Sequence, residues 1–261
     1  MHYRLVQPQN FIDIHRSFIE QFARAVSLIS TGSGAIVAAK DIQSRHFTAT
    51  DLYGVMHGLS CGKHAQGLMD SEMPCEDVAR FAECYVRSDR RLLDCGAHIG
   101  AMQTVLNIHR YATGSRALVF DKFLLKHHPT RSILGIVLAA YETRIDRFTA
   151  CFPGYWTEFG FGCTIERVER PSVDGLGKLS QVEHEVAFLL AVGLDTETLA
   201  RVLPRLRPGS GADVDAALFG LAEKASRAGV PMAGLRDCLI EAHVHQRMPK
   251  SFFARVDGFN P

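Results

Sequence analysis

Apolar side chains recur at every third or fourth position near the N-terminus, which is the spacing of one face of an α-helix. The series begins with Phe11, Ile14, Phe18 and Phe22. It predicts an amphipathic helix that ends near Thr31, where the stretch "TGSG" begins. We therefore assign residues 1–33 to an N-terminal helical element.

The pattern then changes to short apolar runs that are typical of strands. Two of them, "AIVAAKD" (35–41) and "RHFTATD" (45–51), are joined by a turn-like "IQS". Residues 75–94 return to helical spacing. Three longer strand-like runs follow at 99–110, 115–126 and 132–141. This order predicts an α+β domain over 34–142, with helices on an antiparallel five-stranded sheet.

Helical periodicity returns after a segment rich in proline and glycine. "RPSVDGLGK" (170–178) has the composition of a linker, and we assign 143–178 to a connector. The range 179–261 is predicted to be all α. Ser180 and Glu183 form an S-x-x-E capping box, which marks the start of its first helix.

The α+β range resembles a PAS domain. "AKDIQSRHFTATD" occupies the place of the first PAS hairpin, and "GLMDSEMPCEDVARFAE" resembles the approach to the long helix. "DRRLLDCGAHI" resembles the exit from that helix, and "ILGIVLAAYETR" resembles the closing strand. The resemblance implies a sensor that binds a small molecule or cofactor, or a dimerising module, and it does not imply an enzyme.

On this resemblance, Phe81 and Tyr85 lie on the inner face of the long helix. We name them, with His57, as candidate ligand-pocket residues. Ordinary core packing is the competing and more common role of such residues. PAS domains can also hold haem through one histidine, and the candidates would be His57, His64, His98 and His109. We do not expect haem, because a lone histidine is more often a surface or hydrogen-bonded residue. We do not expect a metal site either, because the twelve histidines show no zinc-finger or H-E-x-x-H spacing.

The C-terminal range is similar to the four-helix LuxR/GerE-type helix-turn-helix domain. "LSQVEHEVAFLLAVGLDTETLARVL" follows the first two helices of that family, and Asp195 is placed to cap the second. "GLRDCLIEAHVHQRMPKSFF" resembles the fourth helix and the tail after it. A PAS domain followed by this domain is a common regulator layout. The two resemblances together imply a signal-responsive, DNA-binding transcriptional regulator that acts as a homodimer.

The segment at the place of the recognition helix departs from the family pattern. It is longer than usual, and Pro204 and Pro208 predict that the second helix stops early. Ser210 and Asp213 can cap the third helix, but a carboxylate there repels DNA phosphates. The inward residues are predicted to be Val214, Leu218, Leu221 and Ala225. The outward residues are predicted to be Ala216, Phe219, Gly220, Glu223 and Arg227.

The candidate DNA-binding residues are Arg201, Arg205, Arg207, Ser210 and Arg227. Residues 178–250 carry nine lysines and arginines and nine acidic residues, so this range lacks the positive charge that supplies much of DNA affinity. The alternative is a regulatory protein-interaction partner whose degenerate helix-turn-helix domain no longer binds DNA, with Phe219 serving a protein surface. A third hypothesis is a ligand-binding sensor without transcriptional output.

Composition narrows these hypotheses only slightly. A net charge of +1 gives no global attraction to nucleic acid or to anionic membranes. Apolar runs fall short of the ~20 residues that span a bilayer, and the N-terminus lacks a signal-peptide pattern. Seven cysteines without a CxxC pair indicate reduced thiols in the cytoplasm. The sequence has no G-x-S-x-G elbow, and we do not expect an enzyme.

Overall fold

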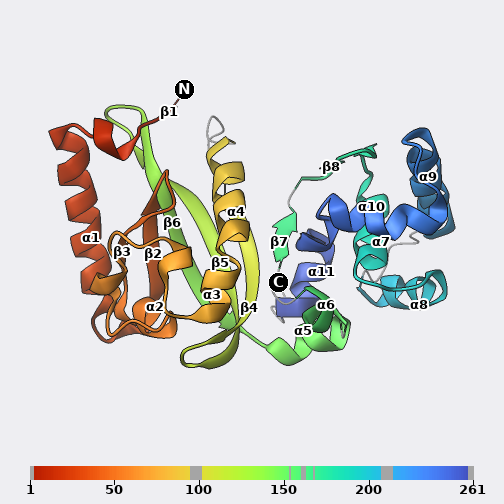
Figure 1. Ribbon diagram of the computed structural model, residues 1–261, viewed down its shortest axis with the longest axis horizontal. Helices are drawn as coiled ribbons and strands as arrows, with labels where there is room; N and C mark the ends of the chain where they lie inside the picture. Colours follow the sequence, from red (N-terminus) through yellow and green to blue (C-terminus); the bar gives the residue numbers. More distant parts are fainter. Residues whose placement is uncertain are drawn as a thin grey trace. The chain divides into compact units, whose positions relative to one another are not determined.

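The computed structural model describes residues 3–94, 102–152, 154–159, 163–166, 168–206 and 214–257. The chain divides into two units, Met1–Thr143 and Arg144–Pro261 (Figure 1). Each unit has its own core, and the two are described separately below. Among the described residues, no helix combines the length and the apolar character that crossing a bilayer requires.

Unit 1 is a sheet with helices on both faces. Its strands are β1 (Arg4–Leu5), β2 (Ile36–Asp41), β3 (His46–Ala49), β4 (Met102–Tyr111), β5 (Gly114–His127) and β6 (Ser132–Thr143). Its α-helices are α1 (Asp13–Ser33), α2 (Asp51–Met56), α3 (Glu76–Arg80) and α4 (Ala82–Asp94). Short 3₁₀ helices include η2 (Gly62–Ala65) and η3 (Asp70–Glu72).

Antiparallel pairs give the strand order β4-β5-β6-β2-β3. The predicted five-stranded sheet omitted β1, which pairs in parallel with β6. This strand pairs with Ser132 and Ile133, whereas the β2 pairing begins only at Gly135. That end of β6 is therefore left available to the N-terminal segment. Sequence periodicity does not reveal this pairing.

Two apolar clusters occupy opposite faces of the sheet, as alternation along a strand requires. Ala38, Ile136 and Leu138 belong to the cluster that also contains residues of α2, α3 and α4. Their neighbours Ala39 and Val137 belong to the cluster that packs against α1 (Figure 1). Because both faces are covered, the strands carry long apolar runs with few polar positions.

Two predicted helices differ in detail. The helix predicted over 75–94 is divided into α3 and α4 at Phe81, whose φ of −101° and ψ of 11° are not helical. The N-terminal helix departs from helical geometry at Thr31 and Gly32, where the sequence predicted its end. Gly32 has a φ of +74°, which glycine adopts without strain.

Unit 2 is mixed rather than all α. It contains α5 (Ile145–Cys151), α6 (Tyr155–Phe159), α7 (Gln181–Ala191), α8 (Thr196–Leu206), α9 (Val214–Arg227), α10 (Leu235–Glu241) and α11 (Lys250–Asp257). Its strands are β7 (Cys163–Glu166), β8 (Ser172–Val173), β9 (Gly177–Lys178) and β10 (Arg247–Pro249). The prediction that 179–261 is all α was wrong, because β10 pairs in parallel with β7.

The range assigned to a connector contributes to the core of unit 2. Phe148 of α5 and Phe152, the residue just after that helix, make edge-to-face contact with each other, and Phe152 does so with Phe188 of α7. All three rings are buried. The linker-like segment 170–178 contains the β8–β9 hairpin. Its glycines therefore serve a tight turn that composition alone does not distinguish from a flexible linker.

Candidate functional site

A small polar cavity lies inside unit 1, between the sheet and the helical side that carries α2 to α4. Its volume is about 20 Å³, enough for one water molecule. Its polar lining residues are Lys40, Tyr53, His57, Asp70, Tyr85, Asn107, Tyr111 and Lys122. Val78, Phe120 and Leu138 complete the wall. Polar groups therefore converge in the interior of an otherwise apolar core.

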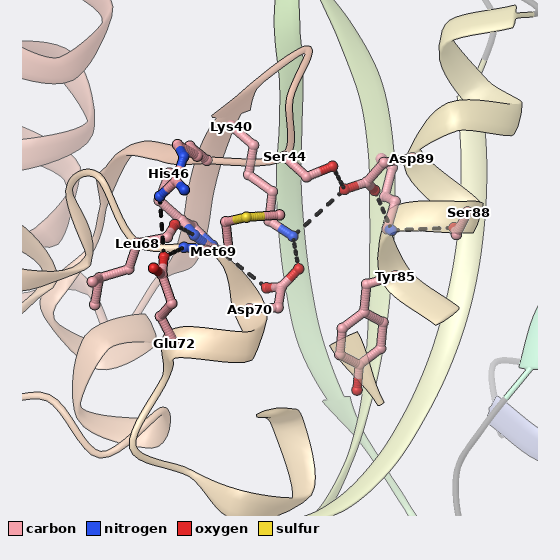
Figure 2. Close-up of polar contacts among 12 residues, drawn as sticks. Lys40, Ser44, His46, Leu68, Met69, Asp70, Glu72, Tyr85, Ser88 and Asp89 are labelled. Atoms are coloured by element: carbon pink, nitrogen blue, oxygen red, sulfur yellow. Dashed lines mark hydrogen bonds and ion pairs between the residues drawn. The ribbon is translucent and has the colours of Figure 1, made fainter. Parts of the chain in front are cut away.

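Four charged side chains form one buried cluster at this cavity. Lys40 Nζ, from β2, lies 2.5 Å from Asp70 Oδ2 of η3 and 3.6 Å from Asp89 Oδ2 of α4 (Figure 2). Lys122 Nζ, from β5, lies 2.6 Å from Asp89 Oδ1. Each of these side chains is at most 4% exposed. Two cations balance two anions, which is how proteins accommodate buried charge.

Hydroxyl groups complete the cluster (Figure 2). Ser44 donates to Asp89 Oδ2 at 3.1 Å, and Lys122 donates to Ser88 Oγ at 3.2 Å. Ser88 in turn donates to Gln103 Oε1 at 2.7 Å. These bonds tie the loop between β2 and β3, helix α4 and strands β4 and β5 to one network.

Opposite charges hold Lys40 and Asp70 ionised. Burial alone would lower the pKa of the Lys40 ammonium, but Asp70 and Asp89 raise it above its ordinary value. Burial alone would raise the pKa of Asp70, but Lys40 and His46 lower it. Both groups therefore remain charged at neutral pH.

Three buried histidines near the cavity are neutral at pH 7. Burial lowers the pKa of His46, His57 and His109 to about 4 in each case. His57 Nδ1 donates to the Tyr53 carbonyl at 2.7 Å, which leaves its Nε2 as an acceptor. His46 Nδ1 donates to the Leu68 carbonyl at 2.8 Å, so its Nε2 accepts from the Tyr53 hydroxyl at 2.8 Å.

One cavity-lining acceptor has no hydrogen bond among the described residues. Asn107 Oδ1 is buried and without a partner. A buried polar atom without a partner costs free energy comparable to a lost hydrogen bond. The site therefore favours a guest that donates a hydrogen bond to Asn107, whether a water molecule or a small ligand.

Two of the three predicted pocket residues line the cavity, and the third does not. His57 and Tyr85 both line the cavity, and Tyr85 shares a hydrogen bond between its hydroxyl and His109 Nε2. Phe81 is half-buried and outside the cavity wall, and its ring stacks on His109 at 5.6 Å between centroids. Of the other histidines considered, His64 is exposed and His98 lies outside the described residues.

Sequence reasoning missed the charged cluster, although a signal for it existed. Lys40 stands at the end of "AIVAAK", and Lys122 stands in "ALVFDKFLL". A lysine inside an apolar strand with both faces covered must be paired if it is buried. The partners Asp70 and Asp89 lie on other elements, so only the fold identifies them.

The start of the range 179–261 agrees with the sequence prediction. Ser180 Oγ accepts from the Glu183 N–H at 3.2 Å, and Glu183 Oε2 accepts from the Ser180 N–H at 2.6 Å. The predicted capping box at α7 is thereby confirmed. Asp195 Oδ1 accepts from the Thr198 N–H at 2.7 Å, which confirms the predicted cap of α8.

Helix α8 does not stop early. It continues through Pro204 and ends at Leu206. Pro204 lies in the last turn, where its missing N–H removes only one hydrogen bond and the helix ends two residues later. Pro208 and the two predicted caps of the next helix, Ser210 and Asp213, lie outside the described residues.

Helix α9 largely presents the predicted face, because Leu221 and Ala225 are buried and Ala216, Glu223 and Arg227 are exposed. Ala217, Leu221 and Ala225 are buried, whereas Val214 and Leu218 are only half-buried. Phe219 is 73% exposed, as predicted.

Gly220 was predicted to face outward, which was wrong. A Cβ atom at this position would lie 2.6 Å from Glu183 Oε1 of α7. Lys224 Nζ also bonds Glu183, at 2.5 Å. This carboxylate sets the approach of α9 to α7, and an isolated helical projection could not include it.

The predicted DNA-binding residues are only partly described. Arg201 is exposed and donates to Thr198 Oγ1 at 3.3 Å. Arg227 is exposed and pairs with Glu223 at 3.4 Å. Arg207 lies outside the described residues, as does the side chain of Arg205.

Comparison with known proteins gives remote matches only. No protein-family profile matches the chain, and no curated protein matches it. VqmA of Vibrio cholerae, a LuxR-type receptor solved as a dimer without its target DNA, is 23% identical, with 89% of this chain and 91% of that chain aligned and a TM-score of 0.42.

Two further solved structures show the same low similarity. A phage VqmA in complex with DPO is 20% identical over 91% of this chain and 93% of that chain, with a TM-score of 0.44. The PAS domain of Bordetella pertussis BvgS is 12% identical over 51% of this chain and 93% of that chain, with a TM-score of 0.36. These values do not assign the chain to a family.

Proposed function

We propose that the chain is a signal-responsive transcriptional regulator. In this proposal residues 34–142 form a PAS-type sensor, residues 179–261 form a LuxR-type helix-turn-helix output domain, and the protein acts as a homodimer. The polar cavity of unit 1, with the unpartnered buried oxygen of Asn107, carries the proposal. A protein interior does not keep such an arrangement for packing alone, because an apolar side chain would be more stable there.

The sensed molecule is small and donates hydrogen bonds. Its donors would satisfy Asn107 Oδ1 and His57 Nε2, and the rings of Tyr53, Tyr85 and Tyr111 would pack around it. The 20 Å³ cavity holds one water, so a larger guest requires side chains to move. A ligand that prefers the rearranged state would shift the population toward it, which is the basis of a sensor response.

A mass-spectrometric comparison tests the sensor role. Protein purified from its source cells and then denatured should release a small molecule. Asn107→Leu should release none, because the variant fills the site and removes its acceptor. An equal yield from both proteins would exclude this cavity as the ligand site.

DNA binding is proposed to depend on the arginines around the end of α8. Both described cations of α9 have acidic partners, Lys224 with Glu183 and Arg227 with Glu223. Arg201, Arg205 and Arg207 are therefore the favoured phosphate contacts, and Ser210 is a further candidate. This assignment follows from their sequence positions and from the exposure of Arg201.

A salt-dependent mobility-shift titration against fragments of the source genome tests the output role. Binding should weaken steeply with added salt, and Arg205→Ala with Arg207→Ala should reduce both the affinity and the salt slope. Lys178→Ala serves as the matched control for loss of positive charge. Binding no stronger than background at low salt would remove the transcriptional role.

A second function has one specific observation in its favour. Phe219 is 73% exposed on α9, and a large exposed aromatic side chain is more typical of a protein interface than of a DNA-facing helix. In this alternative the helix-turn-helix range binds a protein partner and no DNA. Undetectable DNA binding by a folded, ligand-saturated protein would favour it.

A further inference from the structure

A second hollow in unit 1 lies between α1, β3 and η2, on the surface of the unit. Its volume is about 300 Å³, at the lower end of the range for small-molecule pockets. Arg24 and Ser27 line it from α1, and Lys63 lines it from η2. Phe47, from β3, supplies an aromatic wall and packs against Phe22 of α1 at 6.2 Å between ring centroids.

The two cations of this groove have no acidic partner among the described residues, and both are exposed. The groove also contains one acid, Asp51, but one of its oxygens accepts from the Gly62 N–H at 3.0 Å. Positive charge therefore exceeds negative charge in the groove. Two cations from separate elements, beside a hydroxyl group and an aromatic wall, suit a compact anion with a flat apolar part.

The geometry points to a second ligand site, in which Arg24 and Lys63 bind the carboxylate or phosphate group of a small ring-bearing molecule and Phe47 packs against its ring. A bound anion contacts α1 and η2 together, so it holds the N-terminal helix against the sheet. This site is distinct from the internal cavity and does not depend on DNA binding.

Calorimetric titration of the full chain at low salt tests the site with three probes, benzoate, phenyl phosphate and the neutral isostere benzamide. At least one anion should bind, and benzamide should bind about tenfold more weakly or worse, since a charge-assisted hydrogen bond contributes about that factor. Binding of benzoate alone identifies a carboxylate site, and binding of phenyl phosphate alone identifies a phosphate site. Both results support the proposal.

The variant Arg24→Gln with Lys63→Gln should lose about tenfold or more in affinity for the bound anion. Lys178 is an exposed lysine on β9, outside the groove, and the control variant Lys178→Gln should keep the wild-type affinity. The substituted side chains are exposed, so the melting temperature should stay close to that of the wild type. In hydrogen exchange, the anion should slow exchange of the α1 amides at residues 23–30 in the wild type and not in the double variant.

Three results would overturn the proposal. They are equal binding of benzamide and the anions, unchanged anion affinity in the double variant, and no binding of either anion. Each of these leaves the sensor and DNA-binding proposals intact, since those depend on other residues.

Discussion

Removing one anion from the buried charge cluster should destabilise unit 1 strongly. Asp89→Asn takes away the carboxylate that lies 2.6 Å from Lys122 and 3.6 Å from Lys40. Lys40 keeps Asp70 at 2.5 Å, but Lys122 remains in a site where its side chain is 3% exposed. Leaving one partner of a buried pair without its counter-charge costs about 3–5 kcal/mol. In a unit of this size that corresponds to a fall in melting temperature of about 6–20 °C.

Hydrogen exchange in urea provides the assay, because β5 and β6 amides report on unit 1. The single tryptophan, Trp156, belongs to unit 2, so its fluorescence follows that unit and not unit 1. Asp13→Asn is the matched control, since its pair with Arg16 is at the surface and contributes at most about 1 kcal/mol.

The double variant Asp89→Leu with Lys122→Met removes both charges and should recover much of the lost stability. If Asp89→Asn lowered the stability of unit 1 no more than Asp13→Asn does, the cluster would not be the buried, mutually dependent network described above. The same conclusion would follow if the double variant were less stable than Asp89→Asn alone.

Three further predictions concern other parts of the fold. Burial lowers the pKa of His57 to about 4, so protonation of this histidine favours the unfolded chain. The free energy of unfolding should therefore fall by up to about 3 kcal/mol as pH falls from 6.5 toward 4. His57→Gln should flatten this pH dependence in urea titrations. Gly135→Ala places a Cβ 2.0 Å from a backbone carbonyl of β2 and should cost about 1–3 kcal/mol by thermal melting, unlike Gly154→Ala, which meets open space. Glu183→Gln should destabilise unit 2 by about 1 kcal/mol in tryptophan-monitored unfolding, and an unchanged midpoint would contradict its roles as helix cap and partner of Lys224.

Local sequence patterns accounted for the parts of the fold that depend on neighbouring residues. The capping box of α7, the Asp195 cap of α8 and the helical spacing of α1 are examples, because their partners lie within a few positions along the chain. Tyr85 and His57, which we named as candidate pocket residues, line the polar cavity, but their role in binding a ligand stays a prediction.

Features that join distant elements were missed. Lys40 meets Asp70 and Asp89 across thirty or more positions, and Gly220 meets Glu183 across two helices. The parallel pairings of β1 with β6 and of β7 with β10 have no turn signal, because their partners are far apart in the chain. Periodicity describes one element at a time and cannot specify such contacts.

The way α9 is held has a consequence for how this protein can change over time. The helix is fixed from one side, by Ala217, Leu221 and Ala225 and by the bond from Lys224 to Glu183. Phe219 lies on the opposite, solvent-facing side. Substitutions on that outer surface should therefore be nearly neutral for folding. Selection is therefore free to change the side chains of this outer surface while the packing beneath it stays the same.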